Sequence, residues 1–347
     1  MRILHLAPLW FPVSRDAPGG IETYLPGLLS ALGKLGCQCT LLASGDSSVE
    51  AELAPVIPRN LCAEMEAGTA AEYAYFEQHQ LLLALELATE FDVVHSHIGG
   101  SAYVLSGVPG LGARVLHTQH NPVYPDQEWF VSRHPDLWFS TVSEFQARKI
   151  CRLGASRCQV IPNGLDVTAF TYQPRGGDGL FFLGRMEEEK GPDIALRLAR
   201  TLGRPLVLAG PIVDEAFFDR AIKPYLDDRI RYVGVVDHRR KNELFGQAGC
   251  VVMPSRVEEG FGMVSIEAMA CGTPVVALGN GALPEIVEPG VTGYLASTEE
   301  GLAVASRQAF ALDRAAIRDR VGARFDLPRI AERYCRLYEN ISTAAKA

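Results

Sequence analysis

Short apolar runs alternate with longer helical patterns along the 347-residue chain. In the first half, residues 21–35 and 70–89 carry apolar positions at helical spacing, and the first of these patterns stops at Gly36. The apolar runs between them predict strands at 2–7, 39–43, 92–95, 113–120 and 138–143. Because these strands are apolar on both faces and are separated by helices, they indicate a parallel sheet in an α/β domain.

The amino-acid composition changes near residue 162, where a stretch rich in Pro and Gly predicts a linker over 166–178. A second series of predicted strands follows, at 180–184, 205–210, 229–234, 249–254 and 273–278. The expected fold class is therefore α/β, with two Rossmann-like, doubly wound domains, 1–165 and 179–327, facing each other across a ligand-binding cleft. An amphipathic helix at about 328–347 is expected to join the first domain.

Composition narrows the class of partner. The net charge of −8 excludes a general nucleic-acid binder, which needs a basic surface, but leaves room for a local basic pocket. The eight cysteines show no zinc-site spacing and favour reduced thiols in a cytoplasmic protein without a leader or membrane span. The basic residues Arg148, Lys149, Arg152 and Arg157 leave open either a solvated helix or a peripheral contact with a membrane.

The stretch EGFGMVSIE, residues 259–267, holds two carboxylates around a glycine-rich turn that predicts a helix beginning near Gly262. In a continuous helix, Glu259 and Glu267 would be ~12 Å apart along the axis, wider than the ~5 Å between the carboxylates of a retaining glycosidase. The two acids are therefore expected to bracket one elongated ligand, with the N–H groups of the helix start between them suited to a diphosphate. The alternative is a capped helix with two solvated glutamates.

The motifs taken together resemble glycosyltransferase family 4, the retaining group 1 enzymes of the GT-B fold. The E-x-F-G-x-x-x-x-E element of that family is matched by residues 259–267, and the other landmarks occur in order: GGIE at 19–22, DVVHSH at 92–97, TQH at 118–120, IPNGLD at 161–166, GR at 184–185 with KG at 190–191, and LPEIVEPGVTGYL at 283–295. The chain departs from the family in the loop 279–285, and residues 44–80 match no motif.

The resemblance implies roles for individual residues. Arg185 and Lys190 would stabilise the charge that grows on the β-phosphate, with a local ion pair to Glu187, Glu188 or Glu189 as the alternative. Glu259 would contact the transferred sugar, and Glu267 would bind the ribose. The remaining donor-binding residues implied are Gly184, Phe261, Gly262, Met263 and Val264 for the phosphates and sugar, and Val235 and Val236 for the base.

In the first domain, the resemblance assigns His120 to the donor sugar, although a histidine at the end of an apolar strand is more often a structural one. Gly19 and Gly20 would place the first long helix with its N-terminus towards the diphosphate, or would form an ordinary turn. His95, His97 and His117 are weaker candidates, and no pair of these histidines has helical metal-binding spacing.

The chain also lacks a D-x-D motif, so catalysis without a metal ion is expected, with no cofactor beyond the nucleotide-diphosphate sugar that serves as co-substrate. The predicted reaction is retaining transfer of a hexose to an acceptor hydroxyl on a glycan, a lipid-linked molecule or a small molecule. Two alternatives remain: a nucleotide-sugar 2-epimerase of the same architecture, and a non-catalytic protein that binds nucleotide sugars.

Overall fold

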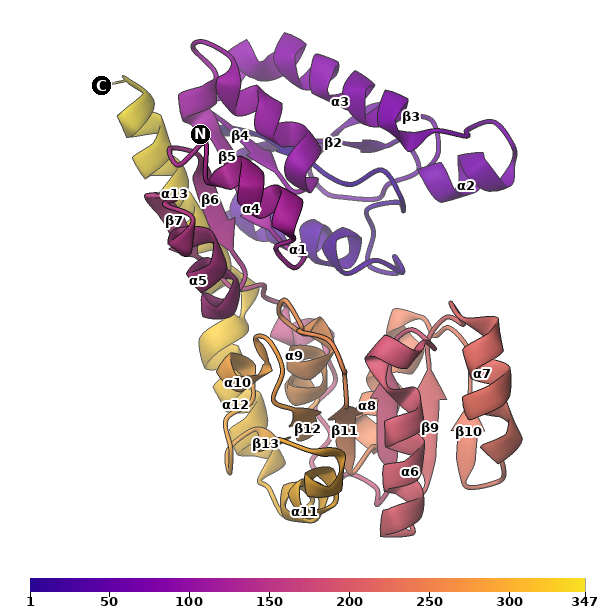
Figure 1. The fold of residues 1–347 in the computed structure, drawn as a ribbon. Coiled ribbons are helices and arrows are strands. Elements are labelled where there is room, and N and C mark those ends of the chain that lie inside the picture. The colour runs from indigo at the N-terminus through magenta and orange to yellow at the C-terminus, as the bar shows by residue number, and fades with distance from the viewer. Residues whose placement is uncertain (347) are drawn as a thin grey trace. The chain divides into compact units, whose positions relative to one another are not determined.

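The chain divides into two compact units, each built around one parallel sheet (Figure 1). The computed structural model describes residues 1–346. The first unit is Met1–Leu165 together with helix α13 (Leu327–Lys346), and the second is Asp166–Asp326. Residues 166–178, where a linker is expected, group with the second unit, and Val167 N donates to Asp326 Oδ1 at 3.3 Å.

Within residues 1–346, the first unit holds a seven-stranded parallel sheet in the order β3-β2-β1-β4-β5-β6-β7. Its strands are β1 (Arg2–Leu6), β2 (Gln38–Ser44), β3 (Glu52–Ile57), β4 (Val93–Ser96), β5 (Val115–Gln119), β6 (Trp138–Thr141) and β7 (Arg157–Val160). Its helices are α1 (Gly20–Lys34), α2 (Leu61–Glu66), α3 (Tyr73–Leu87), α4 (Pro125–Val131), α5 (Glu144–Arg152) and α13, with short 3-10 turns between some of them.

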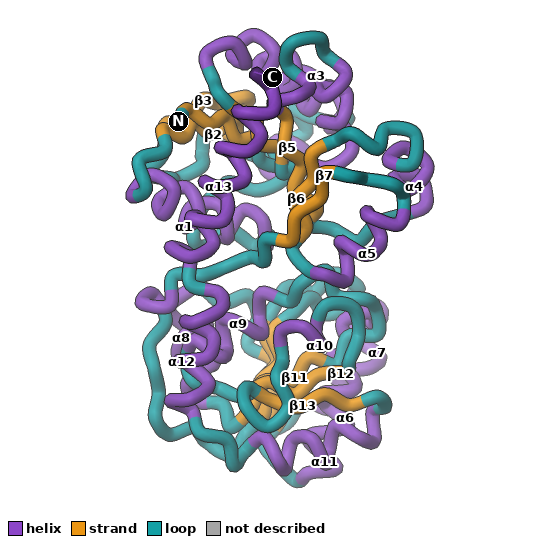
Figure 2. The backbone as a smooth tube through the Cα atoms, turned by 90° about the vertical axis from the view of Figure 1, so that its left-hand side faces the viewer, coloured by secondary structure: helices purple, strands orange, loops and turns teal. Residues whose placement is uncertain are grey.

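Alternation along the strands fills two cores, one on each face of this sheet. Ile3 of β1 packs with α1 and α13, whereas Leu4 and Leu6 pack on the opposite face with α3. Figure 2 shows α1 and α13 side by side, and Tyr334 and Tyr338 of α13 are fully buried against the sheet. The C-terminal helix is therefore part of the core of the first unit.

The second unit holds a six-stranded parallel sheet in the order β10-β9-β8-β11-β12-β13, counted over the described residues. Its strands are β8 (Leu180–Leu183), β9 (Leu206–Ala209), β10 (Ile230–Tyr232), β11 (Cys250–Met253), β12 (Val275–Leu278) and β13 (Gly293–Ala296). Its helices are α6 (Pro192–Leu202), α7 (Glu215–Ala221), α8 (His238–Gln247), α9 (Met263–Ala270), α10 (Leu283–Ile286), α11 (Glu299–Ala309) and α12 (Arg314–Phe325).

Both faces of this sheet are also covered. Leu180 and Phe182 of β8 pack in the core formed with α6, α7 and α11. Phe181 lies between them on the opposite face and contacts Phe245 of α8, with ring centroids 5.3 Å apart. Local signals set the ends of the helices: α6 begins with Pro192 and ends at Gly203, whose φ of 63° lies in the left-handed region.

The predicted fold class, with two doubly wound α/β units, is confirmed. The strands β3, β7 and β13 were not predicted, because each mixes polar residues, Pro or Gly with the apolar ones. The four basic residues do not share one helix: Arg148, Lys149 and Arg152 lie on α5, but Arg157 begins β7 and its guanidinium lies 5.1 Å from the centroid of the Trp138 ring. Among the described residues, no helix combines the length and apolar character needed to cross a bilayer.

Packing of α13 gives a first prediction. Leu337→Ala should lower the free energy of unfolding, measured by urea denaturation, by about 2–5 kcal/mol, because it leaves a cavity where a leucine is 2% exposed. Arg336→Ala, one residue away on the exposed side of the same helix, is the matched control and should leave stability nearly unchanged. A control as destabilised as the leucine variant would contradict the packing described.

Candidate active site

In both units the order of the strands reverses beside the first strand, at β1 and β4 in one sheet and at β8 and β11 in the other. Connections leaving two such neighbouring strands turn in opposite directions and open a crevice at the carboxyl ends of the strands. Chemically active side chains are therefore expected at these two edges, and most of the predicted site residues follow one of these four strands.

In the second unit, the segment after β8 carries the two predicted phosphate-binding cations. Arg185 is 52% exposed, and its guanidinium donates to Glu187 Oε1 at 2.7 Å, so the local ion pair considered as an alternative is present. Lys190 instead reaches 69 residues along the chain, and its Nζ lies 2.7 Å from Glu259 Oε1. The structure thus brings the loops after β8 and β11 together through Lys190 and Glu259.

Close backbone packing holds the Gly184 segment in place. Gly184 N donates to Ala209 O at 3.0 Å, and the φ of Gly210 is 131°. A Cβ at Gly210 would lie 2.0 Å from Gly184 O, so no side chain fits at that position without movement of the backbone. The turn that precedes Arg185 is therefore fixed against the end of β9.

The acidic stretch adopts the predicted layout of a loop followed by a helix. Gly262 precedes α9 with a φ of 92°, and a Cβ there would lie 2.9 Å from Leu283 Cδ2. Phe261 lies just before it and is buried, while Met263 and Val264 form the first turn, whose N–H groups have no side-chain cap. Glu259 lies in the loop, where its carbonyl accepts from Ala282 N at 2.8 Å.

Glu267 lies inside α9, only 6% exposed, and is paired with a residue that was not among the predicted site residues. Lys241 Nζ, on α8, lies 2.6 Å from Glu267 Oε1. Lys241 sits in the basic run HRRK and looks like solvated surface, yet it is three and four residues before the buried Leu244 and Phe245. That spacing places Lys241 on the buried side of α8 and was the signal available in the sequence.

The predicted base-binding residues lie in the loop between β10 and α8, two strands away from β8 in the sheet. Gly234 has a φ of 75°, and its carbonyl accepts from Gly210 N at 2.9 Å. Val235, which follows it, is 68% exposed, and Val236 comes next in the same loop. The structure places these residues at the same edge of the sheet as Arg185 but does not bring them into contact with it.

In the first unit, Gly19 precedes α1 and Gly20 begins it, so the predicted N-terminus of the helix is present. Glu22 in the first turn is 5% exposed, and a Cβ on Gly19 would lie 2.0 Å from Glu22 Oε2. Burial raises the pKa of the Glu22 carboxyl, and a smaller opposing effect comes from a hydrogen bond to backbone at Glu22 itself. Glu22 was not among the predicted site residues, although its carboxyl lies in the first turn of α1, where an anion would approach the helix.

Histidines gather on the α1 and α13 side of the first sheet. His97 Nδ1 lies 3.0 Å from His120 Nε2, and His97 Nε2 lies 3.2 Å from His5 Nδ1. His95 binds elsewhere, with Tyr338 Oη at 2.7 Å and Thr118 Oγ1 at 2.6 Å. Burial lowers the pKa values of His5 and His120 to about 3, so both rings are neutral at pH 7.

The grouping of His5, His95 and His97 was missed at the level of sequence. One ring nitrogen from each lies within 4.8 Å of the others, a spacing that can hold a metal ion. Both nitrogens of His95 and of His97 take part in hydrogen bonds within the protein. Only helical spacing was considered in the sequence, whereas these residues come from the neighbouring strands β1 and β4. His117 points to the other face, where its Nε2 lies 2.8 Å from Ser106 Oγ.

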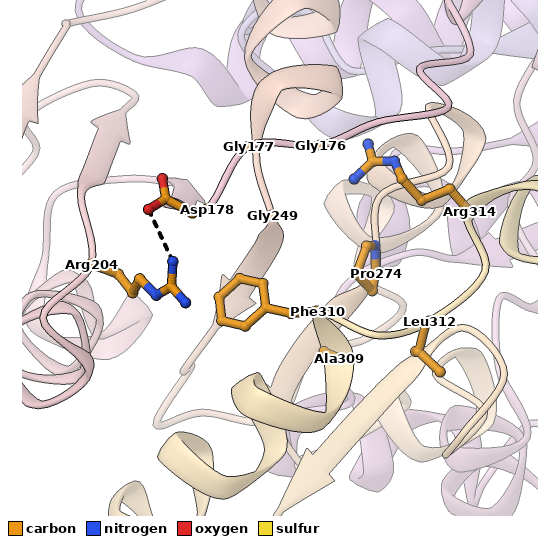
Figure 3. A pocket seen from close by; sticks show the side chains of 10 residues that line it. All are labelled: Gly176, Gly177, Asp178, Arg204, Gly249, Pro274, Ala309, Phe310, Leu312 and Arg314. Atoms are coloured by element: carbon orange, nitrogen blue, oxygen red, sulfur yellow. Dashed lines mark hydrogen bonds and ion pairs between the residues drawn. The ribbon is translucent and has the colours of Figure 1, made fainter.

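The second unit also has a cavity of about 150 Å³ (Figure 3). Its lining includes Asp178, Gly249 and Pro274, which precede β8, β11 and β12, so the cavity opens at the amino ends of the strands. Arg314 lines it too, but the guanidinium donates to the carbonyls of Gln173, Ala248 and Gly246 and is structural. The cavity is not part of the candidate site.

The chain is similar in sequence to known glycosyltransferases. Residues 18–169 match the family described as Glycosyltransferase Family 4, and residues 174–323 match Glycosyl transferases group 1. The chain is 30% identical to the D-inositol 3-phosphate glycosyltransferase of Mycobacterium tuberculosis (strain F11), over 86% of this chain and 72% of that protein. It is 29% identical to the enzyme of the same name from Mycolicibacterium smegmatis, over 84% of this chain and 78% of that protein.

Solved structures give the same picture of the fold. AviGT4, a glycosyltransferase involved in avilamycin A biosynthesis, superposes with a TM-score of 0.78 at 25% identity, over 99% of this chain and 98% of that one. Anabaena HepE in complex with UDP-glucose superposes with a TM-score of 0.74 at 19% identity, over 99% and 100% of the two chains.

The ion pair between Lys241 and Glu267 gives a second prediction. Lys241→Met should lower the free energy of unfolding by about 3 kcal/mol, because it leaves a largely buried carboxylate without its counter-charge. Lys223→Met removes the lysine from an exposed pair with Asp219 and should cause no measurable change in urea denaturation. Equal changes in the free energy of unfolding for the two substitutions would show that the buried ion pair contributes no more to stability than the exposed one.

Proposed function

The chain belongs to the group 1 glycosyltransferases of family 4 and has their GT-B fold, and we propose that it transfers a hexose from a nucleotide-diphosphate sugar to an acceptor hydroxyl with retention of configuration. The observation that carries this proposal is the contact between Lys190 and Glu259 at the carboxyl ends of β8 and β11. A cation suited to phosphate and a carboxylate suited to sugar hydroxyls meet there, at the point where a doubly wound sheet binds its ligand.

The remaining residues of the second unit extend this assignment along one ligand. The uncapped N-terminus of α9, at Met263 and Val264, is suited to the diphosphate. Glu267, held by Lys241, would accept the two vicinal hydroxyls of the ribose. The loop at Val235 and Val236 would hold the base through main-chain groups, and in the first unit we assign the donor sugar to His120.

In the proposed reaction, the bond between the anomeric carbon and the β-phosphate oxygen breaks, and negative charge grows on the departing diphosphate. Arg185 and Lys190 would stabilise that charge in place of a metal ion. The acceptor oxygen then bonds to the same face of the sugar, and its proton passes to the departing phosphate. This sequence retains the configuration and requires no side-chain nucleophile.

The named relatives suggest which substrates to test first. Two curated relatives are named for D-inositol 3-phosphate as acceptor, and the HepE structures hold UDP or UDP-glucose. We propose UDP-sugars as the first donors to test and a phosphorylated polyol as the first acceptor, ahead of glycan and lipid-linked acceptors. A peripheral contact with a membrane would accompany only the lipid-linked class.

A thermal-shift panel of UDP-, GDP-, ADP- and TDP-sugars, with and without EDTA, is the experiment that tests this function. A donor at 100 times its dissociation constant should stabilise the folded protein by about 2.7 kcal/mol through mass action. One nucleotide family should raise the melting temperature, and EDTA should leave the shift unchanged. A shift that EDTA abolishes would contradict the metal-free proposal.

The same panel is followed by product analysis with D-inositol 3-phosphate and glycan acceptors. The expected product is a glycoside whose anomeric configuration, read by proton NMR, matches that of the donor. A new nucleotide sugar formed without any acceptor would indicate the 2-epimerase instead, and a bound donor that is neither transferred nor hydrolysed would indicate a binding protein.

Replacement of Arg185 tests the charge-stabilising role. Arg185→Ala should lower kcat by roughly 100-fold, the scale for loss of one preorganised donor to a developing anion. Arg197→Ala is a matched control, because Arg197 is also 52% exposed and paired with a carboxylate but lies on α6. The control should turn over at the wild-type rate. Wild-type turnover in Arg185→Ala would refute the role of Arg185.

A further inference from the structure

Strand alternation puts three histidines on one face of the first sheet. Ile3 faces α1 and α13, so His5, two residues along β1, faces the same way. The same alternation brings His97, just after β4, to that face, and His120, just after β5, lies there with Tyr24 of α1, ring centroids 6.3 Å apart. All three stand at or near the carboxyl ends of neighbouring strands, beside the reversal of strand order.

These histidines form a linear chain of hydrogen bonds. His97 stands in the middle, with Nε2 at 3.2 Å from His5 Nδ1 and Nδ1 at 3.0 Å from His120 Nε2. At the inner end, Nε2 of His5 is buried and has no partner among residues 1–346. At the outer end, Nδ1 of His120 bonds to no group in the described part of the chain and is not one of its fully buried unpartnered nitrogens. The outer nitrogen is therefore open to a ligand.

Each of the three rings is neutral, because burial lowers the pKa of His5 and His120 to about 3 and that of His97 well below its usual range. A neutral imidazole has one N–H and one lone pair, so each hydrogen bond in the chain has one donor and the bonds must all run in one direction. Only two arrangements satisfy both bonds.

In the first arrangement, His120 donates to His97, and His97 donates to His5. His5 must then carry its proton on Nε2, which leaves a buried N–H with no acceptor. In the second arrangement, His5 donates to His97, and His97 donates to His120. His5 Nε2 is then a bare lone pair. Orphaned buried N–H groups are rarer than under-satisfied buried acceptors, so the second arrangement is favoured.

We propose that His5 and His97 are positioning residues that hold His120 in the tautomer with its proton on Nδ1, so that His120 presents a hydrogen-bond donor to its ligand. The ligand atom it takes is an oxygen with a free lone pair, such as a hydroxyl of the donor sugar. That ligand assignment rests on the proposed function, whereas the tautomer rests on the chain of histidines alone. His120 in this state cannot remove a proton from a ligand through Nδ1.

The tautomer is measured directly by NMR of protein labelled with 15N-histidine, because bare and protonated ring nitrogens differ widely in chemical shift. The His120 signals are assigned by comparison with His120→Gln. In the wild-type protein, Nδ1 of His120 should be protonated and Nε2 bare. A wild-type spectrum with Nε2 of His120 protonated would overturn the proposal, and this result does not depend on any activity.

Whether His97 sets the tautomer of His120 is tested by His97→Asn and His97→Asp. The two new side chains have nearly the same size and shape as each other. Asn has an amide nitrogen that can replace the Nδ1–H of His97, so His97→Asn should keep His120 protonated on Nδ1. Asp offers His120 only an acceptor, so His97→Asp should move a proton to Nε2 of His120. If the two variants give the same His120 spectrum, His97 does not set the tautomer.

The activities of His97→Asn and His97→Asp test whether the hydrogen-bond donor of His120 contributes to sugar transfer. His97→Asn should lower kcat by less than tenfold and His97→Asp by roughly 100-fold, the scale for loss of one positioned donor. UDP affinity serves as the control for an intact donor site, and both variants should match each other in it. His97→Asp buries a carboxylate and should unfold at a lower temperature than His97→Asn, so kcat is compared below both unfolding midpoints. Equal losses of kcat would refute the role of the donor in transfer. If the chain transfers no sugar at all, the proposed function fails, yet the NMR result still decides the tautomer.

Discussion

Parallel pairing is the constraint on which the rest of this molecule depends. Every described strand of both sheets runs in the same direction as its neighbours, so most connections cross back over the sheet as a helix. The helices then cover both faces, so most strand residues are apolar and the buried polar ones, such as His5 and His95, are hydrogen-bonded within the protein. Polar side chains are collected at the carboxyl edge, and the reversal of strand order fixes where along that edge a ligand fits.

The same constraint explains what could be predicted from the sequence. Central strands such as β1, β8 and β11 are nearly continuous apolar runs and are recognisable by themselves. The edge strands β3 and β13 are covered on fewer sides, so they keep residues such as Glu52 and Tyr294 that break the pattern. Their strand character comes from the neighbour that pairs with them, a long-range contact that no local window contains.

The site divides in the same way. Arg185, Lys190, Glu259 and Glu267 could be selected because they recur in a motif whose spacing is local. The partner of Glu267 was not selected, since a buried carboxylate needs a counter-charge but the fold decides which one. Lys241 serves Glu267 from another helix, and His5 reaches His97 from a strand 92 residues earlier. Helical spacing to Leu244 and Phe245 was a usable signal for Lys241, whereas His5 had none.

Helix α13 has a consequence for the order in which the chain is made. The second unit is contiguous, 166–326, while the first needs the apolar face of a helix that begins at Leu327. During synthesis on a ribosome, the second unit is therefore complete before the first one. Part of the core of the first unit stays uncovered until α13 has been made. Tyr334, Leu337, Tyr338 and Ile341 close that core only after the whole second unit has been made. Nascent chains paused before Leu327 present an open hydrophobic sheet face, which is the kind of surface that chaperones bind.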